Sequence, residues 1–552
     1  MQLIALALVL AVGGAGGVGG AGNVGGTGGA GPAERWWSNA VYYRIQVDSF
    51  KDINGDGLGD LQGVTKQMSY VRALGADAII LSAISARSSD CTCPGVTNFA
   101  EIDDRYGDLN TFKSLIEKTH RLELKVVITL KLEAISVASE WYKLSVARNT
   151  GYEDIILWKE AKPDAPVSWN GLNWTWSEDR GAHYAATDNG ALLDLCAENT
   201  ALALSTALCV WLKRGISGVL LNVNRDSECT GKLVKGLAAD ARSCARSANL
   251  ETPVIIVELE ASPADGALYD YEGNGANSVI SNALTSPTRP TGPDLAVAVL
   301  TDMFRSPQDM AATWQTSITG GTRIATRYGS EMVDAVNLLA LILPGAAIIQ
   351  QGDELGAADT LLEWVSTADC WPAKGEPSLA PFPWDDTPGA GFTSGQPWLP
   401  LATNYRYANA KTEFANELSH VGVVRVAAAM RKSLAMGPHT EIRRLGNALS
   451  VLRWGGSGSL LVVVNFGRSQ LDVELTNVPG LPPTMTVAAS SGGSSLSTGD
   501  HVTIDKSLRL GPGDAVLLAG PARHCGGPGP VDKIANKLSE GWQKINKYFS
   551  NI

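Results

Sequence analysis

Cysteine, histidine and charged residues are all scarce in this chain. Its 552 residues include 8 cysteines and 6 histidines, and no two cysteines have the C-x-x-C spacing. This composition argues against a disulfide-rich scaffold and against a structural zinc site. Charged residues make up 18%, with 45 basic and 56 acidic side chains and a formal net charge of −11. An acidic chain without a basic block lacks the surface that binds nucleic acid, so we expect no nucleic-acid partner.

Charge is absent from the first 33 residues, which are apolar and rich in glycine. The apolar run Leu3–Val12 has the length of a signal-peptide core, but no lysine or arginine precedes it. The segment 1–33 could therefore be a signal peptide, a membrane anchor or the remnant of a longer anchor, all of which place the chain outside the cytosol. The alternative is a low-complexity tail without a targeting role. The sequon at Asn173 favours a glycosylated protein, either secreted or on the extracellular face of the plasma membrane.

Short apolar, β-branched segments alternate with helical patterns over the next 400 residues. Lys125–Leu132, Gly218–Val223 and Pro253–Val257 are examples of such segments. This alternation is typical of parallel strands covered by helices and predicts an α/β protein with a (β/α)₈ TIM barrel over residues 34–435. Residues 134–198 interrupt the alternation, lack a helical period and predict an inserted subdomain.

The pattern changes near residue 436. Short strands between Gly, Pro, Asn and Ser turns predict an all-β C-terminal sandwich domain over 436–520. A Gly/Pro linker follows over 521–530, and apolar residues then recur every three or four positions over 531–552. This last segment predicts an amphipathic helix, which either packs on the protein itself or contacts a membrane surface or partner.

Long sequence phrases resemble glycoside hydrolase family 13, in its maltase and oligo-1,6-glucosidase branch. They begin with YYRIQVDSFKDINGDGLGDLQG and continue with GADAIILSAI, FAEIDDRYGDLNTF, TRYGSEMVDAVNLLALILPG and QQGDELG. The resemblance covers most of the chain and implies the same inserted barrel with a β-domain behind it. Family members cleave α-glucosides with a nucleophilic carboxylate, a carboxylic acid and a third carboxylate that holds the sugar.

The chain departs from the family at most of the catalytic positions. By this resemblance Asn222 occupies the position of the family's nucleophilic carboxylate, and Leu220 occupies the position of the arginine that supports it. Glu258 occupies the position of the family's catalytic acid, and Gly320 occupies the position of its third carboxylate. An amide cannot form the glycosyl ester, so we expect a catalytically degenerate site that does not hydrolyse sugar.

The loop DINGDGLGD keeps a pattern that resembles the calcium loop of the maltase branch. Asp52, Asn54, Asp56 and Asp60 stand at alternate positions, and the Leu58 carbonyl would complete the ligand set. Carboxylate and amide oxygens in this arrangement suit Ca²⁺, which would have a structural role. The alternative is a loop of Asx turns without an ion.

The family also includes the heavy chains of heteromeric amino-acid transporters, and the insertion 134–198 makes the chain resemble the rBAT-like kind. That resemblance implies a non-enzymatic subunit that stabilises and traffics a multi-pass transporter light chain. The cysteine expected beside a membrane anchor is missing, since none precedes Cys91. The alternatives are a secreted, inactive maltase homologue or weak sugar-binding module, and an active α-glucosidase.

Overall fold

The computed structural model describes residues 32–521, apart from 91–92, 94, 161–167, 170–171, 224–227, 260–274, 306–310, 364–375, 434–438, 456 and 479. Segment 1–33, apart from its last two residues, therefore lies outside the described residues. The same is true of the expected linker, apart from its first residue, and of the expected helix 531–552.

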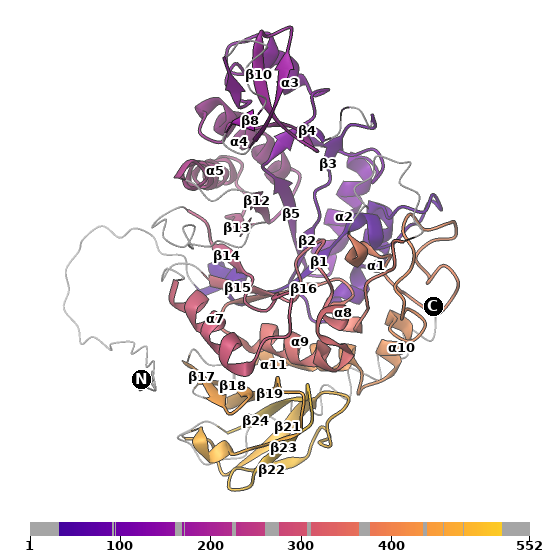
Figure 1. Ribbon diagram of the computed structural model, residues 1–552, viewed down its shortest axis with the longest axis vertical. Helices are drawn as coiled ribbons and strands as arrows, with labels where there is room; N and C mark the ends of the chain where they lie inside the picture. Colours follow the sequence, from indigo (N-terminus) through magenta and orange to yellow (C-terminus); the bar gives the residue numbers. More distant parts are fainter. Residues whose placement is uncertain are drawn as a thin grey trace, which may run out of the picture.

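Eight parallel strands close into a barrel, in the spatial order β1-β16-β15-β14-β13-β12-β5-β2 (Figure 1). Every residue of β12 and β13 is buried, as expected for parallel strands that are covered on their outer face by helices. The strands are β1 (Val41–Ile45), β2 (Ala78–Leu81), β5 (Lys125–Lys131), β12 (Gly218–Val223), β13 (Val254–Leu259), β14 (Ser278–Ser281), β15 (Ala311–Gln315) and β16 (Ala346–Gln350). The predicted TIM barrel is confirmed.

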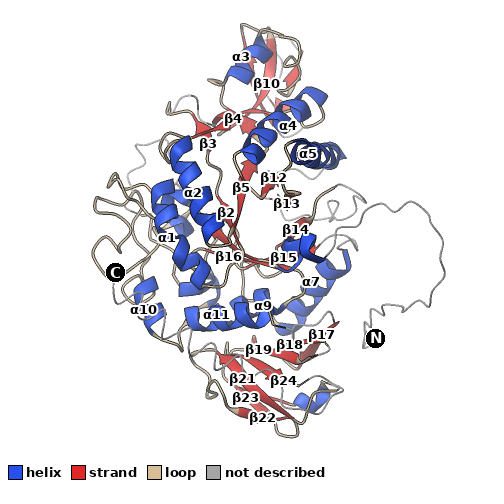
Figure 2. Cartoon of the chain, turned by 180° about the vertical axis from the view of Figure 1, so that it is seen from behind, coloured by secondary structure: helices blue, strands red, loops and turns tan. Residues whose placement is uncertain are grey.

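Helices surround the barrel on the outside (Figure 2). Two of them begin at aspartates whose side chains accept a backbone N–H of the first turn, Asp60 for α1 and Asp108 for α2. The helices are α1 (Leu61–Ala73), α2 (Leu109–Arg121), α4 (Glu198–Lys213), α5 (Glu228–Ser247), α7 (Gly292–Arg305), α8 (Ile324–Tyr328), α9 (Val333–Ile342), α10 (Ala410–Ala415) and α11 (His420–Arg431). Short 3-10 helices are η1 (Pro32–Asn39), η2 (Val47–Ser49), η3 (Ser330–Met332), η4 (Asp353–Leu355), η5 (Pro377–Leu379) and η6 (Leu475–Asn477).

The insertion forms a second sheet at one end of the molecule (Figure 1). It contains β6 (Ala134–Ile135), β7 (Trp158–Lys159), β8 (Ser168–Trp169), β9 (Leu172–Ser177), β10 (Ala182–Thr187) and β11 (Gly190–Leu192), with helix α3 (Glu140–Val146). Two strands from outside the expected range, β3 (Ser85–Arg87) and β4 (Val96–Ile102), join the same sheet. The subdomain is therefore built from two separate stretches of the chain.

The C-terminal domain is antiparallel and lies at the opposite end of the molecule from the insertion (Figures 1 and 2). A six-stranded sheet, in the order β17-β18-β19-β24-β21-β22, stands beside the two-stranded sheet β20-β23. The strands are β17 (His439–Leu445), β18 (Ala448–Trp454), β19 (Ser459–Asn465), β20 (Leu471–Val473), β21 (Thr484–Ser490), β22 (His501–Thr503), β23 (Leu508–Leu510) and β24 (Ala515–Gly520). The predicted all-β domain is confirmed.

One hydrophobic core continues from the barrel helices into the β-domain. The cluster that holds Leu338 and Leu341 of α9 also holds Val451 of β18, Val462 of β19 and Leu517 of β24. One face of the six-stranded sheet is therefore buried against the barrel, while the other face packs into a separate cluster within the domain. Among the described residues, no helix has the length and apolar character that a membrane span requires.

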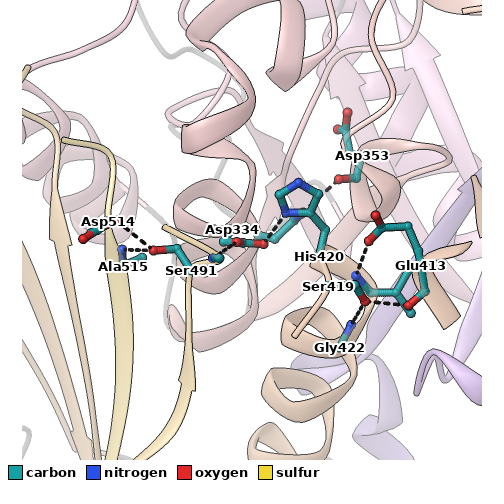
Figure 3. Close-up of polar contacts among 12 residues, drawn as sticks. Asp334, Asp353, Glu413, Ser419, His420, Gly422, Ser491, Asp514 and Ala515 are labelled. Carbon is teal, nitrogen blue, oxygen red and sulfur yellow. Dashed lines mark hydrogen bonds and ion pairs between the residues drawn. The ribbon is translucent and has the colours of Figure 1, made fainter. Parts of the chain in front are cut away.

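Polar contacts also cross this junction (Figure 3). Asp334 of α9 is buried, and its carboxylate lies 2.7 Å from Nδ1 of His420 on α11. The other oxygen of Asp334 accepts the backbone N–H of Gly492 in the β-domain at 3.3 Å. Burial opposes the charged imidazole, but Asp334 and Glu413 outweigh that effect and raise the pKa of His420 to about 9. The junction is thus held by a charged pair as well as by apolar packing.

Candidate active site at the carboxyl end of the barrel

Polar side chains gather where the barrel strands end. Inward-facing residues deeper in the barrel are apolar, among them Tyr42, Val127, Leu220, Ile256 and Ile348. Since side chains alternate along a strand, the inward position two residues further on lies at the carboxyl end. Together with Lys131, which ends β5 four residues after Val127, those positions form what we call the polar ring. Its other members are Arg44 of β1, Asn222 of β12, Glu258 of β13, Gln315 of β15 and Gln350 of β16. Active sites of (β/α)₈ barrels lie at this end.

A buried ion pair dominates the polar ring. The two terminal nitrogens of Arg44 lie 2.8 Å from Oε1 and 2.6 Å from Oε2 of Glu258, in a bidentate arrangement. Arg44 also donates to Oε1 of Gln315 at 3.1 Å. The side chains of Arg44 and Glu258 are 5% and 7% exposed. This geometry fixes the direction of the Glu258 carboxylate.

Asn222 and Glu258 are neighbours in the sheet as well as in the ring. They are register partners on β12 and β13, and Nδ2 of Asn222 donates to Oε2 of Glu258 at 3.1 Å. Arg44 and Asn222 together use three of the roughly four lone-pair positions of the Glu258 carboxylate. The structure therefore brings together two of the three positions that the resemblance identifies as a degenerate catalytic set, and it leaves room for a further donor on Glu258.

The electrostatic surroundings keep Glu258 ionised. Burial alone would raise the pKa of its carboxyl group, but the charge and hydrogen bonds of Arg44 outweigh burial and lower the pKa. The hydrogen bond from Asn222 and the charge of Lys131 act in the same direction. Glu258 is thus a carboxylate acceptor rather than a proton donor at neutral pH.

Gly320, the third predicted position, lies in the loop that follows β15. Its neighbour Thr319 is exposed and its hydroxyl lies 3.5 Å from Oε1 of Gln350 in the polar ring. Ser317 and Thr316 earlier in the loop are buried, and Thr316 donates to Asp353 at 2.7 Å. The loop is therefore anchored beside the ring, although no side chain projects from position 320.

The expected calcium loop folds around its own backbone. Asp52 accepts the N–H groups of Gly55 and Gly57 at 2.7 and 2.8 Å, and Asn54 accepts that of Asp56 at 2.8 Å. The two remaining carboxylates of the expected ligand set are used in the same way. Asp56 accepts the N–H of Leu58 at 2.8 Å, and Asp60 accepts those of Ile53 and Gly63 at 2.9 and 2.7 Å. Nowhere in the described part of the chain are three His, Cys, Asp or Glu side chains grouped to hold a metal. The arrangement resembles the ion-free loop of Asx turns, and calcium stays a prediction.

Two disulfides tie the helices on either side of β12. Cys196, which lies just before α4, pairs with Cys229 of α5, and Cys209 of α4 pairs with Cys244 of α5. The expected glycosylation residue Asn173 lies on β9 of the insertion with an exposed side chain, as an acceptor requires. Its glycosylation stays a prediction.

Sequence reasoning missed Arg44, Gln315 and Gln350. A signal for Arg44 was available, because a lone charged residue within the apolar strand VYYRI must be buried and paired. Gln315 and Gln350 are likewise polar residues in otherwise largely apolar strands, and each is the last residue of its strand. Their partners could not be read from spacing, since Arg44 and Glu258 are 214 residues apart.

The fold and the polar ring define a (β/α)₈ barrel protein with a carboxylate at the active-site end. The sequence profile described as "Alpha amylase, catalytic domain" matches residues 44–239 and 287–437, more than half of the chain. The chain belongs to the alpha-amylase family. Both matched stretches contain residues of the polar ring.

Curated relatives cover most of this chain. Maltase 1 of Drosophila virilis is 28% identical in an alignment of 517 positions, which covers 82% of this chain and 82% of its own. A probable alpha-glucosidase of Rhizobium meliloti is 28% identical and covers 80% of this chain and 92% of its own. The salivary alpha-glucosidase of Aedes aegypti is 25% identical and covers 87% and 95%.

Solved structures share the fold. An alpha-glucosyl transfer enzyme superposes with a TM-score of 0.74 at 23% identity, covering 88% of this chain and 99% of its own. The trehalose-6-phosphate hydrolase of Bacillus licheniformis superposes with a TM-score of 0.73 at 19% identity, covering 88% and 100%.

These comparisons correct the expected function. The sequence led us to expect a non-enzymatic heavy-chain subunit of an amino-acid transporter, and that expectation is wrong. The curated relatives are named maltases and alpha-glucosidases. The error arose because we weighed single catalytic positions above the similarity that extends along the whole chain. The light-chain partner that followed from that expectation has no support from the comparisons.

Proposed function

We propose that this chain acts on α-glucosides at the polar ring, with Glu258 as the carboxylate that meets the substrate. The observation that carries the proposal is the position of Glu258, ionised and oriented at the carboxyl end of β13. The names of the curated relatives, maltase and alpha-glucosidase, support the same substrate class.

The ring supplies acceptors and donors that suit sugar hydroxyl groups. The remaining lone-pair position of Glu258 can accept a hydrogen bond from a sugar hydroxyl, and Lys131 is exposed at the same end of the barrel. Asn222 contributes an amide where a covalent mechanism requires a carboxylate, and Arg44 keeps Glu258 charged. We therefore expect turnover much slower than that of a maltase with two carboxylates at these positions, since both routes of glycoside hydrolysis use a pair.

A binding and turnover assay tests the proposal. Maltose, isomaltose and trehalose are titrated calorimetrically, and release of glucose or of an aryl leaving group is measured on the same preparations. We expect millimolar or tighter binding that weakens about tenfold or more in Glu258→Gln, because the hydrogen bond to a charged acceptor is lost. Asn222→Asp alone should not reach the turnover of a maltase, since Leu220 and Gly320 remain. The exposed Glu251→Gln is the matched control.

The outcomes separate three conclusions. Binding with slow, Glu258-dependent turnover supports the proposal. Binding without turnover would point to a sugar-binding member of the family. If the native protein neither binds nor cleaves any of the three sugars, the proposal is wrong.

We also propose that the protein is secreted. The two disulfides between the α4 and α5 regions support an oxidising compartment, and two relatives are named salivary alpha-glucosidases. Expression in a eukaryotic secretory system, followed by peptide mass spectrometry, tests this location. We expect both disulfides and a glycan on Asn173; retention of the whole product inside the cell with free thiols would contradict the proposal.

A further inference from the structure

A carboxyl group fills the space that the missing side chain at Gly320 leaves. A Cβ atom at Gly320 would lie 3.2 Å from Cδ of Glu376 and 3.3 and 3.5 Å from its two carboxyl oxygens. The backbone at Gly320 has φ of +78°, a conformation that glycine adopts readily. Glu376 follows β16 in the chain, so the two residues come from the loops of adjacent barrel strands.

A buried arginine holds the backbone two residues after Glu376. Nε of Arg323 donates to the carbonyl of Ser378 at 2.9 Å, and its Nη1 donates to that of Gln351 at 2.7 Å. The carbonyl of Glu376 itself accepts the N–H of Leu379 at 3.1 Å. Arg323 is 3% exposed and lies three residues after Gly320. The loop that carries Glu376 is therefore tied to the loop that carries Gly320.

The same loops border the polar ring. Thr319 contacts Gln350, which is the register partner of Arg44, and Arg44 binds Glu258. Glu376 and Gly320 are both half-buried and so have contact with solvent. A sugar held at the polar ring would lie against this border.

We propose that Glu376 is a sugar-binding residue of this site and supplies, from a neighbouring loop, the carboxylate that position 320 lacks. A carboxylate can accept hydrogen bonds from two adjacent hydroxyl groups of a sugar ring, and such charge-assisted hydrogen bonds are strong. With Glu258, the site then presents two carboxylates to an α-glucoside. This inference rests on the proposed function, because it assumes that an α-glucoside binds at the polar ring.

Calorimetric titration of maltose into Glu376 variants tests the inference. Glu376→Gln keeps the shape of the side chain and should weaken binding about tenfold to a hundredfold, because the charged acceptor is lost. Glu363→Gln is the matched control, since Glu363 is an exposed glutamate before the same loop and should bind as the native protein does. Thermal melting of each variant separates loss of binding from loss of folding.

A second substitution distinguishes the carboxylate itself from a structural role. Gly320→Asp in the native background should weaken binding, because it crowds Glu376 with a like charge. In a Glu376→Ala background, the same Gly320→Asp should improve binding, since Asp tolerates positive φ better than most residues and restores the carboxylate. A purely structural role for Glu376 would not reverse the sign of this effect.

Two outcomes overturn the inference in different ways. If the native protein binds maltose and Glu376→Gln binds it equally well, Glu376 is not a binding residue and the proposed function is unaffected. If the native protein binds none of maltose, isomaltose and trehalose, the proposed function fails and this inference fails with it.

Discussion

Arg44 and Glu258 form a buried ion pair between two strands at the active-site end of the barrel. Each is buried and charged, and each is the principal partner of the other. Removal of one charge from such a pair leaves the other desolvated and uncompensated. The pair therefore serves both the stability of the barrel and the ionisation of the site.

Glu258→Gln should destabilise the protein by about 3 kcal/mol or more, because Arg44 stays buried without a counter-charge. Urea unfolding of the native protein and the variant measures the difference. The control Glu251→Gln removes one charge from an exposed pair with Lys125, in which the side chains are 73% and 34% exposed. It should change the stability by about 0.5 kcal/mol or less. Equal effects of the two substitutions would show that the buried pair is not structural.

At the scale of elements, loops and helix pairs are held by local hydrogen bonds and by contacts across the junction. The loop between β1 and α1 uses its aspartates as acceptors for its own N–H groups, and Asp52 also accepts the hydroxyl of Thr393 at 2.5 Å. Helices α9 and α11 are joined through Asp334 and His420. The loop leads to a prediction about calcium, and the helix pair leads to a prediction about pH.

Calcium binding at this loop stays a prediction, and melting measurements test it. If the loop binds the ion, millimolar Ca²⁺ should raise the melting temperature relative to EDTA, because an ion bound only to the native state stabilises that state. Asp52→Ala should lower the melting temperature by several degrees even without the ion, since two backbone N–H groups lose their acceptor. Differential scanning calorimetry measures both. A rise of several degrees with Ca²⁺ that Asp56→Ala removes would establish the calcium site that the spacing predicts.

The pair of His420 and Asp334 should make stability depend on pH. Because the pKa of His420 is raised from 6.5 to about 9, its contribution is complete below pH 6.5 and declines until the pH passes about 9. The decline should be about 3 kcal/mol at most and should be absent in His420→Gln. Urea unfolding between pH 6 and 9.5 measures it, with the exposed His501→Gln as control. An unchanged pH profile in His420→Gln would contradict the assignment.

The whole molecule is a barrel with two attachments, each of which forms its own sheet. Both share the core of the barrel, since its largest apolar cluster holds Ile135 and Ile156 of the insertion as well as Val451 and Val462 of the β-domain. The β-domain is therefore part of the folded core rather than an independent module.

Truncation after residue 437 should prevent normal folding, because it exposes the apolar face of α9 that packs on β18, β19 and β24. We expect aggregates in size-exclusion chromatography and increased binding of a hydrophobic dye. Truncation after residue 521 is the control, since it retains the β-domain. A soluble fragment 1–437 with a cooperative melting transition would show that the barrel does not need the domain.

The sequence by itself determined the fold class and much of the local structure. Apolar segments such as Gly218–Val223, which alternate with helical patterns, are typical of buried parallel strands. Asp60 and Asp108 begin helices because their carboxylates accept first-turn N–H groups. The sequence also determined that position 222 carries an amide and position 320 no side chain. These features depend on near neighbours in the chain.

Only the tertiary structure decided which distant residues meet. Closure of the barrel brings Arg44 of the first strand to Glu258, and adjacent loops bring Glu376 to Gly320. The cysteine pairing between the α4 and α5 regions is decided in the same way. No spacing encodes these contacts, because they arise when strands far apart in the chain meet at one end of the barrel. Position 320 has no carboxylate of its own, but the fold places the carboxylate of Glu376 beside it.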